Sequence, residues 1–238
     1  MMMGNNKIKF TFLSEYGWGI EAARPRPASS IIPKWFKEMG QYDDPEGIRV
    51  IDRTSNATAK KCTPMLDSMT SGYILSLWSD ILVHQEEQTG PQLSWKVDRN
   101  VFSLHGESSR KIPPPTGYDN IVFKYNSLMT ITTPPKYSIL VVPPLAHHDL
   151  PIKAIPAIID TDKPTIDLAF PVWIKSGFNG VIEKGTPVVQ IIPFKKESWT
   201  SEIDYMTDKE FVLHMDNNFN SSIKNHYIKN IWSKKEFR

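Results

Sequence analysis

Two aspartates stand where an apolar run ends, in the segment AIIDTD at residues 157–162. Alternate side chains of a strand point to one face of a sheet, so Asp160 and Asp162 lie side by side if the strand continues through them. Such a pair can hold a divalent metal, activate a water molecule or orient a sugar hydroxyl. The segment DTDKP is also typical of a turn, because aspartate side chains hydrogen-bond to nearby backbone amides. Both interpretations stay open.

A second patterned segment follows in EKGTPVVQIIPF, residues 183–194. The first five residues predict a tight turn that leads into a strand, and Gln190 is the only polar residue of the apolar run VVQII. A buried amide without partners costs roughly 1–3 kcal/mol. We therefore expect Gln190 to hydrogen-bond to backbone across a sheet or a subunit interface.

These segments resemble the dUTPase and dCTP deaminase superfamily. AIIDTD is similar to its Ile-Asp-x-Asp strand, and IEKGTPVVQII to its Gly-Asp-x-Ile-Ala-Gln turn and strand. Upstream, TSGYILSLWSDILV at 70–83 is similar to its Ala-Gly-Tyr-Asp-Leu segment, and residues 132–151 take the place of the strand before the aspartates. The resemblance covers residues 62–194 and implies the β-clip fold and a homotrimer.

The resemblance also implies site residues. Asp160 matches the acid that holds the attacking water, Asp162 matches the second acid, and Mg²⁺ would bind the phosphates. Lys163 stands where the base-stacking tyrosine is expected, Tyr73 is a possible stacking residue, and Gln190 is the third predicted ligand-binding residue.

The sequence departs from the superfamily pattern at three places. The phosphate-binding Arg-Ser segment is replaced by Leu145, Ala146, His147 and His148, and no glycine follows Gly185 to form the Gly-rich arm. The glutamate of the deaminase branch falls in TIDLAFPVW, where Asp167 is the only charged residue. The resemblance supports the fold more than the reaction.

Two functional hypotheses follow. The first is a divergent dUTPase-like nucleotide-binding protein, with nucleotide pyrophosphatase activity as its catalytic form. The second is a non-catalytic structural or interaction protein on a trimeric β scaffold, in which the aspartates cap a turn. The second also fits a resemblance, carried by IIPKWFKEM and IPFKKESW, to a family of proteins encoded by tailed phages of marine cyanobacteria.

A third hypothesis rests on His147 and Asp149, which form the His-x-Asp half of a two-histidine, one-carboxylate iron site. His214 lies downstream, with Lys224 beyond it as a basic residue for 2-oxoglutarate. This order is that of an Fe(II)/2-oxoglutarate-dependent oxygenase. However, His214 falls inside a predicted helix, and PPLAHHDLP also reads as a surface turn.

The pattern of apolar residues predicts a mainly β fold, a β-clip barrel or sandwich. We expect a strand at 8–13, a short helix at 29–39 with Ser30 near its N-cap and a loop at 40–60 within an N-terminal segment, 1–61. A β domain follows over 62–197, with strands in LSWKVD, NIVFKYN, YSILVVPP, AIIDTD, TIDLAFPVWI and PVVQIIPF. An extension, 198–238, begins an amphipathic helix at the capping box Thr207 to Glu210.

The composition narrows the function further. A net charge of +2 gives no strong signal for nucleic-acid binding, and the basic residues near the end, Lys234, Lys235 and Arg238, suggest a solvated helix end. One cysteine, Cys62, allows no internal disulfide, and no apolar run is long enough to cross a bilayer. We expect a soluble protein of the cytoplasm, the host cytoplasm or virion if it is phage-encoded.

Overall fold

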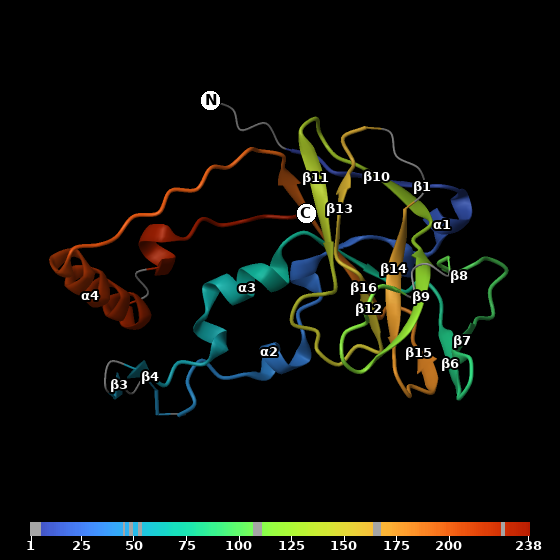
Figure 1. Cartoon of the computed structure of the whole chain (residues 1–238), viewed down its shortest axis with the longest axis horizontal. Helices are drawn as coiled ribbons and strands as arrows, with labels where there is room; N and C mark the ends of the chain where they lie inside the picture. Colours follow the sequence, from blue (N-terminus) through green and yellow to red (C-terminus); the bar gives the residue numbers. More distant parts are fainter. Residues whose placement is uncertain are drawn as a thin grey trace. The chain divides into compact units, whose positions relative to one another are not determined.

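The computed structural model describes residues 6–44, 46–47, 50–51, 54–106, 111–163, 168–224 and 227–238. The chain forms two compact units (Figure 1). The first unit comprises Met1–Ile31 and Gly72–Lys196, and the second comprises Ile32–Ser71 and Glu197–Arg238. Each unit is therefore built from two segments that are far apart in the sequence.

The largest sheet of the first unit has five strands. All neighbouring strands in it are antiparallel, and β11 (Tyr137–Val142) pairs with β13 (Ala157–Asp160) on one side and with β16 (Pro187–Lys195) on the other. The central strands are almost continuously apolar, as expected where both faces are covered. In spatial order the strands are β13 (Ala157–Asp160), β11 (Tyr137–Val142), β16 (Pro187–Lys195), β5 (Tyr73–Ser76) and β2 (Arg26–Pro27).

Three smaller antiparallel sheets complete the first unit. In the described residues, the strand order of each sheet is open, without closure into a barrel. The four-stranded sheet contains β12 (Ile152–Ala154), β14 (Ala169–Lys175), β9 (Tyr118–Asn126) and β8 (Phe102–Leu104). The three-stranded sheet contains β15 (Gly180–Ile182), β6 (Ile81–Glu86) and β7 (Gly90–Ser94), and β1 (Lys9–Phe12) pairs with β10 (Met129–Thr132). Short helical turns lie beside them: α1 (Glu15–Gly19), η1 (Glu21–Ala23) and η2 (Ala28–Ser30).

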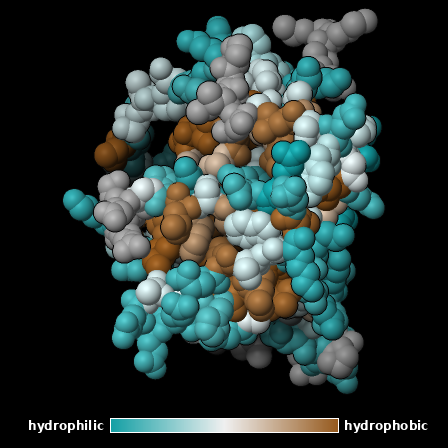
Figure 2. Space-filling view, turned by 90° about the vertical axis from the view of Figure 1, so that its right-hand side faces the viewer, coloured by the Kyte–Doolittle hydropathy of each residue, from teal (hydrophilic) through white to brown (hydrophobic). Residues whose placement is uncertain are grey.

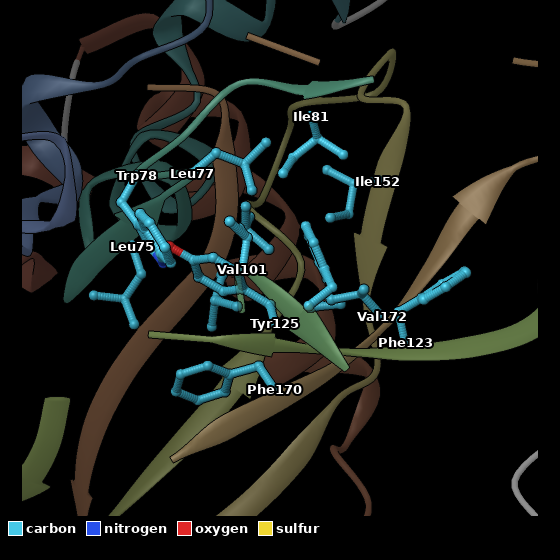
Figure 3. Close-up of a cluster of buried hydrophobic side chains, with 14 of the residues drawn as sticks. Leu75, Leu77, Trp78, Ile81, Val101, Phe123, Tyr125, Ile152, Phe170 and Val172 are labelled. Atoms are coloured by element: carbon cyan, nitrogen blue, oxygen red, sulfur yellow. The ribbon is translucent and has the colours of Figure 1, made fainter. Parts of the chain in front are cut away.

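The core of the first unit gathers apolar side chains from the five-, four- and three-stranded sheets (Figure 3). Two of its polar atoms bond to backbone: the Tyr125 hydroxyl donates to the Ser76 carbonyl at 2.6 Å, and Trp78 Nε1 donates to the Asn126 carbonyl at 2.8 Å. These two bonds link β5 and the turn after it to β9. The core is thus cross-linked by hydrogen bonds as well as packed.

The second unit is mainly helical. Its longest helix, α4, begins with the expected capping box, since the Thr207 amide donates to Glu210 Oε2 at 2.8 Å and the Glu210 amide lies 3.4 Å from Thr207 Oγ1. The elements are α2 (Lys34–Glu38), β3 (Val50–Ile51), β4 (Thr54–Ser55), η3 (Ala59–Lys61), α3 (Thr63–Thr70), α4 (Asp208–Lys224) and the π-helix η5 (Tyr227–Ile231).

The predicted mainly β fold is confirmed, and so are the C-terminal helix and the strand at 8–13, observed as β1. Two local predictions were wrong. Residues 63–70, which were predicted to belong to the β domain, form helix α3. Its Pro64 lies in the first turn, where the backbone amide needs no hydrogen-bond partner within the helix. Ser30 does not cap a helix: its hydroxyl donates to the Pro27 carbonyl, while α2 begins after Pro33.

Two strand boundaries also differ from the prediction. LSWKVD is a strand only to Ser94, where β7 ends, so that Trp95 lies in the following loop. Strand β13 ends at Asp160, and residues 164–167, including Asp167, lie outside the described residues. In the described part of the chain, no helix is long and apolar enough to cross a membrane.

Candidate functional site

The two aspartates lie where three strands end together. In register, Ser138 of β11 pairs with Asp160 on one side and with Phe194 of β16 on the other. The chain leaves β16 at Lys196, whose amide donates to the Lys136 carbonyl at 2.7 Å. Antiparallel pairing therefore brings the end of β13 next to the start of β11 and the end of β16.

Lys196 contacts both carboxylates. Its Nζ is 2.8 Å from Asp162 Oδ2 and 3.5 Å from Asp160 Oδ1. Ser138 Oγ donates to Asp160 Oδ1 at 2.5 Å, and the Lys136 amide donates to Asp162 Oδ2 at 3.1 Å. We call Asp160, Asp162, Lys196 and Ser138 the three-strand clamp, because each strand contributes to it at its end.

The residue between the aspartates points the other way. Thr161 is fully buried, and its hydroxyl is 2.8 Å from the Thr133 hydroxyl, while the Thr133 amide donates to the Thr161 carbonyl at 2.9 Å. Asp160 and Asp162 both direct an oxygen at Lys196 Nζ and thus share the side that the sequence predicted. Because β13 ends at Asp160, this shared side does not come from a strand that continues through both residues.

The electrostatics of the clamp favour the charged forms. The hydrogen bond from Ser138, with the Lys196 ammonium beside it, lowers the pKa of Asp160. The hydrogen bond from Lys196 lowers the pKa of Asp162, and the same bond raises the pKa of Lys196. A carboxylate with a lowered pKa is a weaker general base, since Brønsted behaviour ties base strength to pKa.

The predicted stacking residues lie in different places. Tyr73 pairs in register with Ile191, three strands from β13, which places it about 14 Å from that strand. Its ring packs edge-on against Phe10, with centroids 5.2 Å apart. Lys163 is exposed next to Asp162. Tyr73 is thus not brought to the aspartates, whereas Lys163 adjoins them.

Gln190 makes the backbone bond that the sequence predicted. Its side chain is 1% exposed, and Oε1 accepts the Leu145 amide at 2.9 Å. The acceptor lies on β16 and the donor in the segment after β11, within the first unit of one chain. Gln190 therefore fixes the loop at 143–150 to the five-stranded sheet.

The residues of the iron hypothesis fall in different units. His147 lies in the first unit, where its Nε2 is 2.9 Å from the Ile31 carbonyl, and burial of the ring lowers the pKa of His147. Asp149 is exposed in the same loop, and His214 lies on α4 in the second unit. Among the residues that the structure describes, no three histidine, cysteine or acidic side chains are grouped to hold a metal.

The basic residues near the end are paired within the second unit. Lys235 Nζ donates to Asp67 Oδ2 at 2.7 Å, and Trp232 Nε1 donates to the same oxygen at 2.9 Å. Lys234 and Arg238 both contact Glu236. These residues follow the last helical turn, and Lys235, although it is ion-paired, keeps 48% of its side chain exposed, in agreement with the solvated end that the sequence predicted.

Sequence reasoning missed a cleft in the first unit, bordered by Tyr16, Trp78, Trp95 and Lys184. In the sequence, a tryptophan by itself is typical of a core anchor, as Trp78 is in this structure, and Lys184 is predicted only as part of a turn. The sequence feature that points to the cleft is the turn EKGTP, because its Lys184 amide donates to Asp80 Oδ1 at 2.7 Å, in the turn between β5 and β6.

A comparison of the chain with protein-family models and with curated proteins gave no match.

Proposed function

We propose that this chain is a non-catalytic interaction protein on a mainly β scaffold of the β-clip type. The observation that carries the proposal is the position of Lys196 between Asp160 and Asp162. Ser138 and Lys196 engage Oδ1 of Asp160, and Lys196 with the Lys136 amide engages Oδ2 of Asp162, so both acids are tied to the neighbouring strands. The pair therefore stabilises the strand ends.

The interaction surface in this proposal is the N-terminal half of helix α4. Its side chains Phe211, Val212, Leu213 and Met215 are between 42% and 63% exposed. Phe211 and Met215 lie one turn apart and share a face of the helix, whereas Val212 and Leu213 point to other faces. An amphipathic helix gains most of its stability by burying an apolar face, so a partner that covers Phe211 and Met215 would stabilise α4. We propose that the partner is another copy of this chain, and that the assembly is the homotrimer expected for the fold.

The mass of the protein in solution tests this assembly. Multi-angle light scattering of the wild type should give three times the 27.2 kDa of one chain. The variant Phe211→Glu with Met215→Glu should be a folded monomer, because it places carboxylates on the apolar side. Asn217→Glu is the matched control, since it adds a carboxylate to an exposed position of the same helix. A monomeric wild type would contradict the proposal.

Nucleotide binding is the second candidate function. The side chain of Asp160 is 70% exposed, so a Mg²⁺ ion with a bound phosphate can reach it. This candidate predicts that dUTP, dCTP or dTTP with Mg²⁺ raises the melting temperature, because a ligand of the folded state stabilises it. The shift must vanish in Asp160→Asn. Without a shift in the wild type, the interaction function stands alone.

The cellular setting follows from the same proposal. The resemblance to proteins of tailed phages supports a phage protein that acts in the host cytoplasm or in the virion. Fractionation of purified particles tests this setting, since a structural component must be found in them at fixed stoichiometry.

A further inference from the structure

A cleft of about 640 Å³ opens on the first unit, away from the three-strand clamp. Five parts of the chain border it: helix α1 and the turn after it, the turn between β5 and β6, β6 itself, the end of β7 with its loop, and β15 with the turn that follows. On the face seen in Figure 2, hydrophobic surface gathers in patches enclosed by hydrophilic atoms. The volume is within the range of small-molecule sites, roughly 300–1,000 Å³.

The floor of the cleft is an apolar row across the three-stranded sheet. Val181 of β15 pairs with Leu82 of β6, and Leu82 pairs with Ser94 of β7. Both aliphatic side chains remain about half exposed, Val181 at 53% and Leu82 at 51%. Leaving such groups in water is unfavourable by about 25 cal/mol per Å², so an apolar ligand gains free energy by covering them.

The walls are aromatic and held in place before any ligand binds. Tyr16 is 38% exposed and packs edge-on against the buried Trp78, with centroids 6.3 Å apart. Trp78 is itself fixed by its bond to the Asn126 carbonyl. Trp95 packs against the core residue Phe102 at 6.5 Å. Rigid aromatic side chains bind flat rings at a low entropic cost, because little freedom is lost on binding.

The rim carries more positive than negative charge. Lys96 and Lys184 border the opening, and the guanidinium of Arg99 lies 5.4 Å from the centre of the Tyr16 ring. The one carboxylate on the rim, Asp80, uses Oδ1 to accept the Lys184 amide at 2.7 Å, which holds the β15–β16 turn at the opening. An anionic group is therefore favoured at this edge.

We propose that this cleft binds a small organic anion with a planar aromatic body. The flat body covers Val181 and Leu82 between the aromatic walls, and the anionic group meets Lys96 and Lys184. Nucleoside monophosphates and other aromatic anions share this chemistry. The proposal is independent of Asp160 and needs no metal, which separates it from nucleotide binding at the clamp.

Titration calorimetry in EDTA tests it with two probes, dTMP and 1-anilinonaphthalene-8-sulfonate. We expect at least one to bind the wild type, and the double variant Lys96→Gln, Lys184→Gln to bind it about tenfold more weakly, equivalent to about 1.4 kcal/mol. Lys175→Gln, an exposed lysine outside the cleft, should bind like the wild type. Binding of dTMP indicates a nucleotide, and binding of the sulfonate alone another aromatic anion.

A second pair of variants tests the floor. Val181→Glu places a carboxylate under the ligand and should abolish binding, whereas Ile158→Glu, an aliphatic residue 67% exposed on β13, should leave it intact. Both positions are exposed, so neither change removes core packing. The proposal is wrong if neither probe binds the wild type, or if binding survives unchanged in Val181→Glu.

Discussion

Lys196 Nζ lies 2.8 Å from Asp162 Oδ2 and 3.5 Å from Asp160 Oδ1, so one ammonium group joins the two aspartates of the AIIDTD segment. The lysine comes from the end of β16 and the acids from the end of β13, on either side of β11. The positive charge that stands between the two acids is therefore part of the protein.

The two aspartates should contribute unequally to stability. The side chain of Asp162 is 13% exposed and that of Asp160 is 70% exposed, so water screens the Asp160 ion pair more strongly. We expect Asp162→Asn to lower the melting temperature more than Asp160→Asn does. In Lys196→Met, the difference between the two variants should shrink, because the shared cation is gone. If the difference in melting temperature between Asp162→Asn and Asp160→Asn is as large in Lys196→Met as in the wild type, the clamp does not act through Lys196.

The clamp also makes stability depend on pH. The pKa of Asp162 is lowered in the folded protein, so its contribution is complete above the unfolded value of about 3.9 and is lost as the pH falls through the folded pKa. The difference in unfolding free energy between wild type and Asp162→Asn should therefore be constant near neutral pH and decrease below about pH 4. Urea unfolding measured across this range checks it, and a difference that stays constant in acid would contradict it.

Lys196 makes stability depend on pH in the opposite direction, because its contribution is lost as the pH rises. The pKa of Lys196 is raised, so its contribution is complete below the unfolded value of about 10.4 and is lost as the pH rises through the folded pKa. The wild type should thus lose its advantage over Lys196→Met only in strongly alkaline solution. The same unfolding measurements, extended upward in pH, test this prediction.

Local patterns in the sequence predicted the strands well where apolar residues were continuous or alternating, as in β11, β13 and β16. They failed at residues 63–70, where Ser, Thr and Pro suggested punctuated strands although Pro64 fits a helix start. They also predicted the shared side of Asp160 and Asp162. They could not find Lys196 as their partner, because a cation thirty-four residues downstream is brought there only by the strand order.

The cleft was hidden for a related reason. Tyr16, Trp78 and Trp95 come from three separate elements, and each alone is typical of a core anchor. Only the pairing of β6 with both β15 and β7 makes Val181, Leu82 and Ser94 one row. Such a site follows from topology, which a single sequence does not specify.

The buried amide of Gln190 should be costly to remove. In Gln190→Leu the Leu145 amide loses its acceptor, and an unsatisfied buried donor costs about 1–3 kcal/mol. We expect a decrease of that size in the unfolding free energy, measured by urea denaturation. Gln92→Leu is the matched control, since Gln92 is exposed on β7. If both variants unfold alike, the Gln190 bond is not a source of stability.

Gly72 should tolerate no side chain. Its φ of +75° lies in the left-handed region, and a Cβ there would stand 1.9 Å from the Ile191 carbonyl oxygen of β16. Gly177 has a similar φ of +72° but open space around its Cβ position, so Gly177→Ala isolates the backbone strain, about 1–2 kcal/mol. Gly72→Ala adds a clash with backbone that can be relieved only by separating β5 from β16. We therefore expect Gly177→Ala to fold with a lower melting temperature and Gly72→Ala to lose the cooperative unfolding transition. Equal melting temperatures for the two variants would mean that β5 and β16 can separate at no cost, contrary to the pairing of Ile191 with Tyr73 next to the glycine.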